Sequence, residues 1–174
     1  MGLASFNFSS DLEPEYGGSG FTAVVANVGT TSLEQTATDG GIMLGNPASG
    51  SNSYANAIAN NSYFTLTVTS AGNPLTLVGL GLDASGNASS ARGFGVRSSI
   101  DGYSADIIDG TTALPTQGGV YTQFLRELSQ DFSTSISLRF YVWGGFVGAT
   151  IRFDNLVVAV APAGTTIRRR GLIK

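Results

Sequence analysis

Three aspartates lie close together in the stretch IDGYSADIIDG, and they are the first candidates for chemistry in this chain. They are Asp101, Asp106 and Asp109. Glycoside hydrolysis needs two carboxyl groups about 5–10 Å apart, and loop carboxylates can also bind structural calcium. Gly and Ser surround these aspartates, and in such sequence Asp usually caps or bends the chain. We therefore expect turn carboxylates, with calcium as an alternative. Its further candidate ligands are Asp11, Asp39 and Asp154, and no ligand set is assigned.

The residue types on which most enzymes rely are missing. The chain of 174 residues has no Cys and no His, and its single Lys is Lys174. Disulfides and thiolate metal sites are therefore excluded, and a serine nucleophile has no histidine to activate it. The sequence predicts a non-enzymatic protein without a cofactor. An acid-only glycosidase is the one catalytic alternative.

Two aromatic residues are the candidates for a binding site. In the segment ISLRFYVW, strand alternation turns Phe140 and Val142 inward, so Tyr141 and Trp143 are expected to face outward. Exposed aromatic rings stack on sugar rings or anchor a protein interface. The alternative is that both rings are half-buried at the end of the strand. Arg139, in the same segment, is expected to pair with an acid such as Asp101, and so is Arg97.

The basic residues gather at the end of the chain. Four of the nine Lys and Arg residues occupy the last seven positions, namely Arg168, Arg169, Arg170 and Lys174, although the formal net charge is -3. Three arginines beside an acidic body are a weak nucleic-acid footprint, so nucleic acid is not an expected partner. We expect residues 162–174 to form a short basic arm that docks on a partner protein. A solvated, inert tail is the alternative.

Most of the chain alternates with a period of two, which is typical of strands with one buried face. In YFTLTVT, for example, Phe64, Leu66 and Val68 share one face. Turn-forming segments rich in Gly, Asn, Asp and Pro separate the candidate strands. Besides YFTLTVT, ISLRFYVW and ATIRFDNLVVAV, these are Ala4–Phe8, Phe21–Val28, Gly41–Leu44, Leu75–Leu82, Gly93–Ser99 and Ala105–Ile108. The segment Val120–Ser129 is the best helix candidate, and a strand followed by a turn fits it equally well.

Two candidate strands change phase. In IRFDNLVVAV, Ile151 and Phe153 occupy one phase of the alternation, and Leu156 and Val158 occupy the other. A one-residue slip would turn the later side chains outward unless a β-bulge absorbs it. We therefore predict a bulge at Asp154–Asn155, with side chains bonding the local backbone, and a similar slip at Val78–Gly79.

The segments YFTLTVTSAGNPLTLVGLGLDASG, GFGVRSSIDGYSADI and ISLRFYVWGGFVGATIRFDNLVV, in this order, resemble a bacterial jelly-roll module. The module is common in exported proteins with a PEP-CTERM sorting tail and is similar to carbohydrate-binding modules of the galactose-binding-like kind. The resemblance covers about residues 63–160. It implies an all-β, antiparallel two-sheet jelly-roll β-sandwich, expected over residues 1–161, and a role in adhesion, glycan contact or matrix structure.

The first residues, MGLASFNFSS, lack the features of a signal peptide, and no segment is apolar enough for a membrane span. With only 12% charged residues, copies of the chain repel one another weakly, which favours a homo-oligomer. The first hypothesis is therefore a structural protein of a bacteriophage virion, a capsid decoration or accessory protein whose partners are other virion proteins. The alternative is a carbohydrate-binding or adhesion module of an extracellular or cell-surface bacterial protein.

Overall fold

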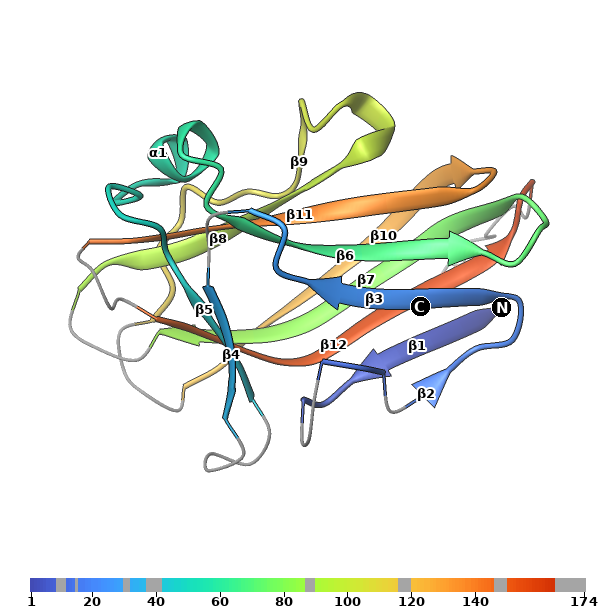
Figure 1. Cartoon of the computed structure of the whole chain (residues 1–174), viewed down its shortest axis with the longest axis horizontal. Helices are drawn as coiled ribbons and strands as arrows, with labels where there is room; N and C mark the ends of the chain where they lie inside the picture. The colour runs from blue at the N-terminus through green and yellow to red at the C-terminus, as the bar shows by residue number, and fades with distance from the viewer. Residues whose placement is uncertain are drawn as a thin grey trace, which may run out of the picture.

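The computed structural model describes residues 1–8, 12–14, 16–29, 32–36, 42–86, 90–115, 120–145 and 150–164. Two antiparallel sheets stack face to face in a jelly-roll β-sandwich, as predicted (Figure 1). Most consecutive strands lie in opposite sheets, so each sheet combines segments from distant parts of the chain. Residues brought together on one face are therefore rarely neighbours in sequence.

Sheet A has the strand order β10-β7-β12-β1-β2, and β5 joins it by pairing with both β12 and β4. Its strands are β1 (Gly2–Phe6), β2 (Tyr16–Gly17), β4 (Ser32–Thr36), β5 (Ile42–Asn46), β7 (Leu75–Gly86), β10 (Thr122–Phe132) and β12 (Ile151–Pro162). The central strands β7 and β12 are twelve residues long and pair along most of their length.

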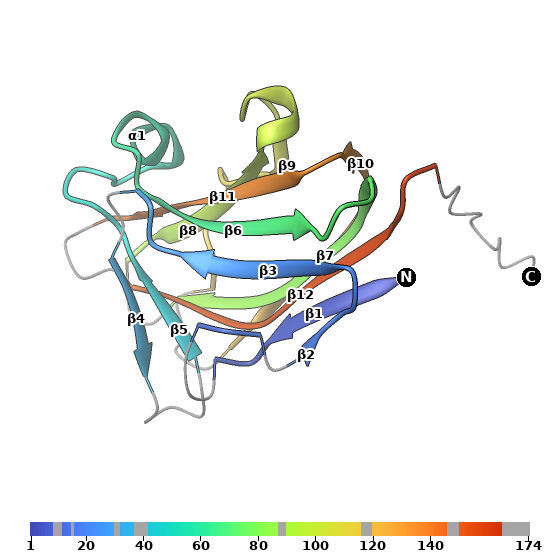
Figure 2. The ribbon, with the colours of Figure 1, turned by 45° about the vertical axis from the view of Figure 1, so that its right-hand side comes forward.

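Sheet B has the order β3-β6-β11-β8-β9. Its strands are β3 (Phe21–Ala26), β6 (Tyr63–Ser70), β8 (Arg92–Ser98), β9 (Asp106–Ile108) and β11 (Ser135–Gly144). The short helix α1 (Tyr54–Ala59) and the 3₁₀ turn η2 (Ser99–Asp101) contact β11. Figure 2 shows α1 on the side of this sheet that faces away from sheet A.

The inward faces of the two sheets form one apolar core, as the alternation predicted. Phe64, Leu66 and Val68 of β6 are fully buried. Phe140 of β11 stacks on Phe64 with ring centroids 4.7 Å apart, and Phe153 of β12 meets Phe64 edge-on at 5.2 Å. These rings join the two sheets at the centre of the sandwich.

Both predicted phase changes are β-bulges. The register of β12 against β7 shifts between Asp154 and Val157, and Asn155 adopts a positive φ of 49°. The N–H of Asn155 donates to Oδ1 of Asp154 at 2.7 Å, so a side chain replaces the missing ladder bond. Because the bulge absorbs the slip, Phe153 and Leu156 both point into the core. The register of β7 shifts in the same way around Val78.

The segment Val120–Ser129 contributes to a strand, so its helical interpretation is wrong. β10 pairs with β7 from Thr122 to Phe132, with one bulge after Glu127. Phe124 and Leu128 pack against the core, whereas Leu125 lies on the outer face and is 66% exposed. Because successive side chains of a strand point to opposite faces, Phe124 and Leu125 lie on different faces, whereas a helix would have kept Phe124, Leu125 and Leu128 on one side. The elements β2, β4 and α1 were not predicted.

Candidate functional site

Tyr141 and Trp143 lie on the outer face of sheet B, as predicted, but they are not exposed there and are buried even more deeply than the half-buried alternative. Their exposed fractions are 3% and 7%. The indole N–H of Trp143 donates to the carbonyl oxygen of Gly110 at 2.7 Å, and its ring covers the backbone of Gly93 so closely that a Cβ there would clash. Neither ring is available as an open platform for a sugar.

Helix α1 is the reason for this burial. Tyr54 and Ala57 of α1 pack with Tyr63, Tyr141 and Trp143 into a second apolar cluster outside the main core. Ser53 starts the helix, because its Oγ accepts the N–H of Asn56 at 3.3 Å. The helix therefore covers the outward aromatics that strand alternation alone would leave in water.

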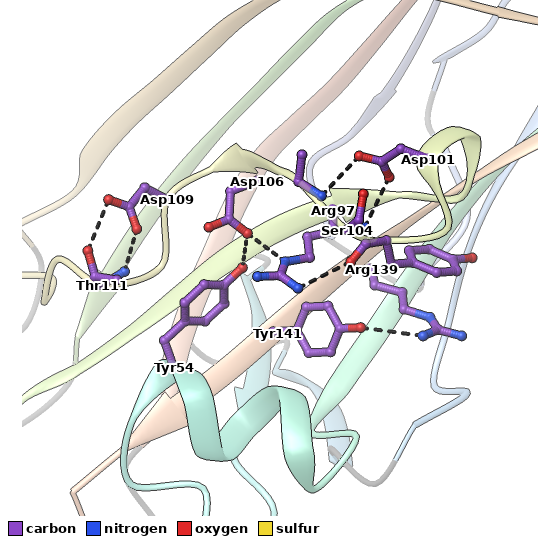
Figure 3. A network of polar contacts seen from close by, with 11 residues as sticks. Tyr54, Arg97, Asp101, Ser104, Asp106, Asp109, Thr111, Arg139 and Tyr141 are labelled. Carbon is purple, nitrogen blue, oxygen red and sulfur yellow. Dashed lines mark hydrogen bonds and ion pairs between the residues drawn. The ribbon is translucent and has the colours of Figure 1, made fainter.

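A polar network lies beside these rings (Figure 3). Oδ1 of Asp106 accepts the hydroxyl of Tyr54 at 2.5 Å and the Nε–H of Arg97 at 2.6 Å. Burial, together with the hydrogen bond to Asp106, raises the pKa of the Tyr54 hydroxyl above its ordinary value. Tyr54 therefore stays protonated as a donor, and this network fastens α1 to β8 and β9.

Arg139 does not pair with Asp101, and neither does Arg97. The guanidinium of Arg139 lies over the rings of Tyr103 and Tyr63, with its Cζ 3.7 Å and 4.4 Å from their centroids. Its Nη1 donates to the hydroxyl of Tyr141 at 3.3 Å. We call Tyr54, Tyr63, Tyr103, Tyr141, Arg97, Arg139 and Asp106 the tyrosine–arginine cluster.

Asp101 and Asp109 are turn carboxylates, as expected, whereas Asp106 begins strand β9 and pairs with Arg97. Asp101 accepts the N–H groups of Ser104 and Ala105, and Asp109 accepts both the N–H and the hydroxyl of Thr111. The bonds from Thr111 hold the pKa of Asp109 below its ordinary value. Although desolvation raises the pKa of Asp101, its backbone hydrogen bonds outweigh that effect and lower it. Both carboxylates therefore stabilise local turns of the chain through hydrogen bonds.

In the part of the chain that the structure describes, no three acidic side chains gather closely enough to hold a metal ion. Asp154 binds the backbone of its own bulge. Asp11 and Asp39 lie outside the described residues. So do the basic arm residues Arg168, Arg169, Arg170 and Lys174, and their docking on a partner stays a prediction.

A concave surface lies on the outer face of sheet A, where sequence reasoning placed no site. It is a groove of about 790 Å³ along β7, which we call the glycine trough. Gly79 and Gly81 of β7 form its floor, because neither brings a side chain to this face. The trough exists because two glycines occupy consecutive outward positions in a central strand.

The neighbouring strands supply the walls of the glycine trough. Glu127 and Leu125 of β10 stand opposite Gly79 and Gly81. On the other side, Ala159 and Val157 of β12 pair with the same two glycines. The trough is therefore apolar on both sides of Gly81, with Leu125 largely exposed to solvent, whereas Glu127 brings a carboxylate beside Gly79.

Hydrogen-bonding groups gather at one end of the trough. Asp83 of β7 pairs in register with Gln123 of β10, and Oδ2 of Asp83 accepts the side-chain N–H of Asn155 at 2.9 Å. Asn155 reaches this place because the bulge in β12 turns its backbone to a positive φ. Arg126 and Glu127 line the trough farther along β10. Two amides, two carboxylates and a guanidinium thus frame an apolar centre.

A signal for the trough was present in the sequence LVGLGLD. Alternation puts Leu80 and Leu82 inward and leaves Gly79, Gly81 and Asp83 on the opposite face. A run of outward glycines predicts a furrow in a sheet. The walls were hidden, because they come from strands more than 40 residues away whose pairing the sequence does not reveal.

No protein-family model matches this chain, and no curated protein matches it. Among solved structures, it is similar to a mutant of a family 29 carbohydrate-binding module complexed with mannohexaose, with 12% identity and a TM-score of 0.44 over 90% of this chain and 91% of the other. The CBM22-1 xylan-binding domain of Xyn10C from Paenibacillus barcinonensis has 13% identity and a TM-score of 0.43 over 91% and 94%. Likeness at this level identifies neither a ligand nor a binding residue in this chain. Within the described ranges, no helix is long and apolar enough to cross a membrane.

Proposed function

We propose that this protein is a non-catalytic binding module that holds a short stretch of a neutral glycan in the glycine trough. The observation that carries the proposal is the trough itself, an open groove with an apolar middle and hydrogen-bonding groups around it. A sugar ring presents C–H groups on its faces and hydroxyls at its rim. Leu125 and Val157 match the faces, while Asp83, Gln123 and Asn155 match the hydroxyls.

The charges of the trough favour a neutral ligand. Its lining contains two carboxylates, Asp83 and Glu127, and one guanidinium, that of Arg126. Moreover, Arg126 is turned partly away, since its Nε donates to the carbonyl of Ile107 at 3.2 Å. An acidic glycan would meet net negative charge in the trough, whereas a neutral one avoids this repulsion.

The two carboxylates are placed for binding rather than for hydrolysis. Asp83 of β7 stands opposite Gln123 of β10, and Glu127 lies four residues after Gln123 in β10. At about 3.4 Å per residue, their Cα atoms are roughly 14 Å apart. Glycosidases hold their two carboxyl groups about 5–10 Å apart across the scissile bond. This spacing supports a module that holds sugars without cleaving them.

Filling the floor of the trough tests the proposal. In the variant with both Gly79→Ala and Gly81→Ala, the two methyl groups would occupy the space of the ligand. The first meets Cβ of Ala159 at 3.4 Å, an ordinary contact, and the second meets the flexible end of Leu125 at 3.1 Å. Because alanine is easier than glycine to hold in a strand, the domain should keep its stability. We expect neutral oligosaccharides to bind the wild type and to lose at least about tenfold in affinity for the variant.

A glycan array with neutral glucan, mannan and xylan oligosaccharides would find the ligand, and calorimetry would compare the variants. The matched control is Gly17→Ala, because a Cβ at Gly17 meets no atom within 4 Å. The control should bind as tightly as the wild type. Absence of binding to every neutral glycan, or equal affinity of the filled variant, would show the proposal to be wrong.

Glycan binding would place the chain outside the cell or at its surface. The virion hypothesis depends instead on the arm at residues 162–174, most of which lies outside the described residues. Tracking the polypeptide by mass spectrometry across a density gradient separates the two locations. Stoichiometric co-sedimentation with capsids would favour the virion, and its presence in surface fractions alone would favour the glycan module.

A further inference from the structure

The outer face of sheet B carries an imbalance of charge. Arg139 of β11 stands directly opposite Arg97 of β8, so two like charges face each other across a strand pair. Such a pair is unfavourable unless nearby carboxylates compensate for both charges. Among the described residues, only Arg97 has such a partner, because its Nε lies 2.6 Å from Asp106.

The nearby acidic groups are already in use. Oδ1 of Asp106 accepts from both Arg97 and Tyr54, and Asp101 accepts the backbone N–H groups of its own turn. Among the described residues, no carboxylate lies within 4.0 Å of Arg139. The half-buried guanidinium of Arg139 therefore has no counter-charge within the part of the chain that the structure describes, although the net charge of the protein is negative.

The hydroxyl of Tyr141 adds a second hydrogen-bond donor beside Arg139. Nη1 of Arg139 donates to the hydroxyl oxygen of Tyr141, which leaves the proton of that hydroxyl free to donate onward. Tyr141 is 3% exposed, and among the described residues the only hydrogen bond of its hydroxyl is the one that it accepts from Arg139. The hydroxyl proton can therefore be donated to a ligand oxygen beside Arg139.

Two tyrosine rings hold the guanidinium in place. Tyr63 and Tyr103 both lie within 4.4 Å of its Cζ, a distance that suits cation–π attraction. Tyr103 has a positive φ of 65°, which is uncommon for an aromatic residue. Its backbone is fixed by bonds from its N–H to Ser98 and from Arg97 to its carbonyl. Strain of this kind is common where a side chain must be aimed at a ligand.

We propose that Arg139 and Tyr141 form a second binding site, which takes the carboxylate group of an acidic sugar. A carboxylate is planar and accepts two parallel bonds from a guanidinium, and a further lone pair can accept the hydroxyl of Tyr141. The partly buried ring of Tyr103, which lies over the guanidinium, gives the sugar an apolar rim (Figure 3 shows Arg139 beside Tyr141). The site is independent of the glycine trough, since it lies on the opposite sheet and selects the opposite kind of ligand.

Titration with methyl glucuronide tests this site in the intact chain, and methyl glucoside is the matched probe without the carboxylate. Trp143, the only Trp in the chain, belongs to the same apolar cluster as Tyr141, so its fluorescence reports binding locally. We expect the glucuronide to bind, the glucoside not to bind, and the affinity to fall as salt rises. Inorganic sulfate distinguishes a site for any anion from a site for a planar carboxylate. Weaker binding of sulfate supports the proposal, whereas sulfate binding as tight as that of the glucuronide overturns the carboxylate assignment.

Three variants locate the binding. Tyr141→Phe keeps the ring packing and removes the hydroxyl, both as a donor to the ligand and as an acceptor for Arg139. Arg139→Lys keeps the charge but loses the planar fork. Each should weaken glucuronide binding at least about tenfold while the protein stays folded by circular dichroism. The trough variant with Gly79→Ala and Gly81→Ala is the control and should bind the glucuronide unchanged. If the wild type ignores the glucuronide, or if both cluster variants bind it normally, Arg139 only packs the tyrosines together.

Discussion

Trp143 is held by a covering helix and by one hydrogen bond, so its role is structural. Replacing it by alanine would open a large cavity beneath α1 and remove the donor to Gly110. We expect Trp143→Ala to lower the free energy of unfolding by about 3–5 kcal/mol, as for other buried aromatics. Urea denaturation followed by circular dichroism measures the change.

The conservative variant Trp143→Phe separates the two contributions. It keeps most of the ring packing and loses the hydrogen bond, so it should lower the free energy of unfolding by only about 1 kcal/mol. If Trp143→Ala were as stable as the wild type, the ring would have to be outside the fold, contrary to its burial.

Tyr54 makes the stability sensitive to alkaline pH. Burial and the bond to Asp106 raise its pKa in the folded protein above the ordinary value, so folding favours the protonated hydroxyl. Its contribution is complete below the unfolded pKa of about 10 and is lost as pH rises through the folded pKa. We expect the free energy of unfolding to fall more steeply between about pH 9 and pH 11 in the wild type than in Tyr54→Phe. Urea denaturation of both proteins at several pH values across this range measures the two slopes. Equal slopes of the free energy of unfolding against pH would contradict the prediction.

The alternation of single residues could be predicted from the sequence, but their surroundings could not. Tyr141 and Trp143 face outward as the pattern required, and yet both are buried. Periodicity shows which face of a sheet a side chain occupies. It does not show what covers that face, and here the cover is a six-residue helix without a periodic signal of its own.

At the scale of elements, the bulge in β12 serves both the core and the glycine trough. It lets Phe153 and Leu156 point inward, and it turns Asn155 toward Asp83. The positive φ of Asn155 is tolerated by Asn and Gly but strained for β-branched residues. We expect Asn155→Gly to change the free energy of unfolding by no more than about 1 kcal/mol and Asn155→Val to lower it by about 1–3 kcal/mol.

Thermal unfolding of the two variants, each compared with the wild type, checks this order. Equal stability of the glycine and valine variants would show that the bulge relaxes without strain. Asn155→Gly also removes the amide from the trough, so weaker binding of a neutral glycan should accompany its unchanged stability.

Elements with a regular apolar face were predictable, and those without one were not. β6 and β11 follow from strict alternation, and the bulges in β7 and β12 follow from its breaks. The secondary structure of β10 could not be decided from the sequence, because Phe124, Leu125 and Leu128 fit a helix and a strand equally well. Only pairing with β7 resolves the choice, and that contact spans about 45 residues of chain.

At the scale of the whole molecule, the two sheets present unlike outer faces. Sheet A leaves its centre open along Gly79 and Gly81, whereas helix α1 and the turn at η2 cover much of sheet B. The sandwich was predictable from many short alternating segments with turns between them. The trough was not, since it depends on which strands become neighbours. The arm at residues 162–174 and self-association stay predictions.

The pairing of β1 with β12 determines how this protein responds to pulling. These antiparallel neighbours join the first strand to the last, with Gly2 opposite Val160 at one end of the ladder. A force applied to the two ends of the domain would therefore peel the strands apart one hydrogen bond at a time, instead of loading the whole row in shear. Tension in a surrounding polypeptide or fibre would release β1 first, so the domain would yield at low force.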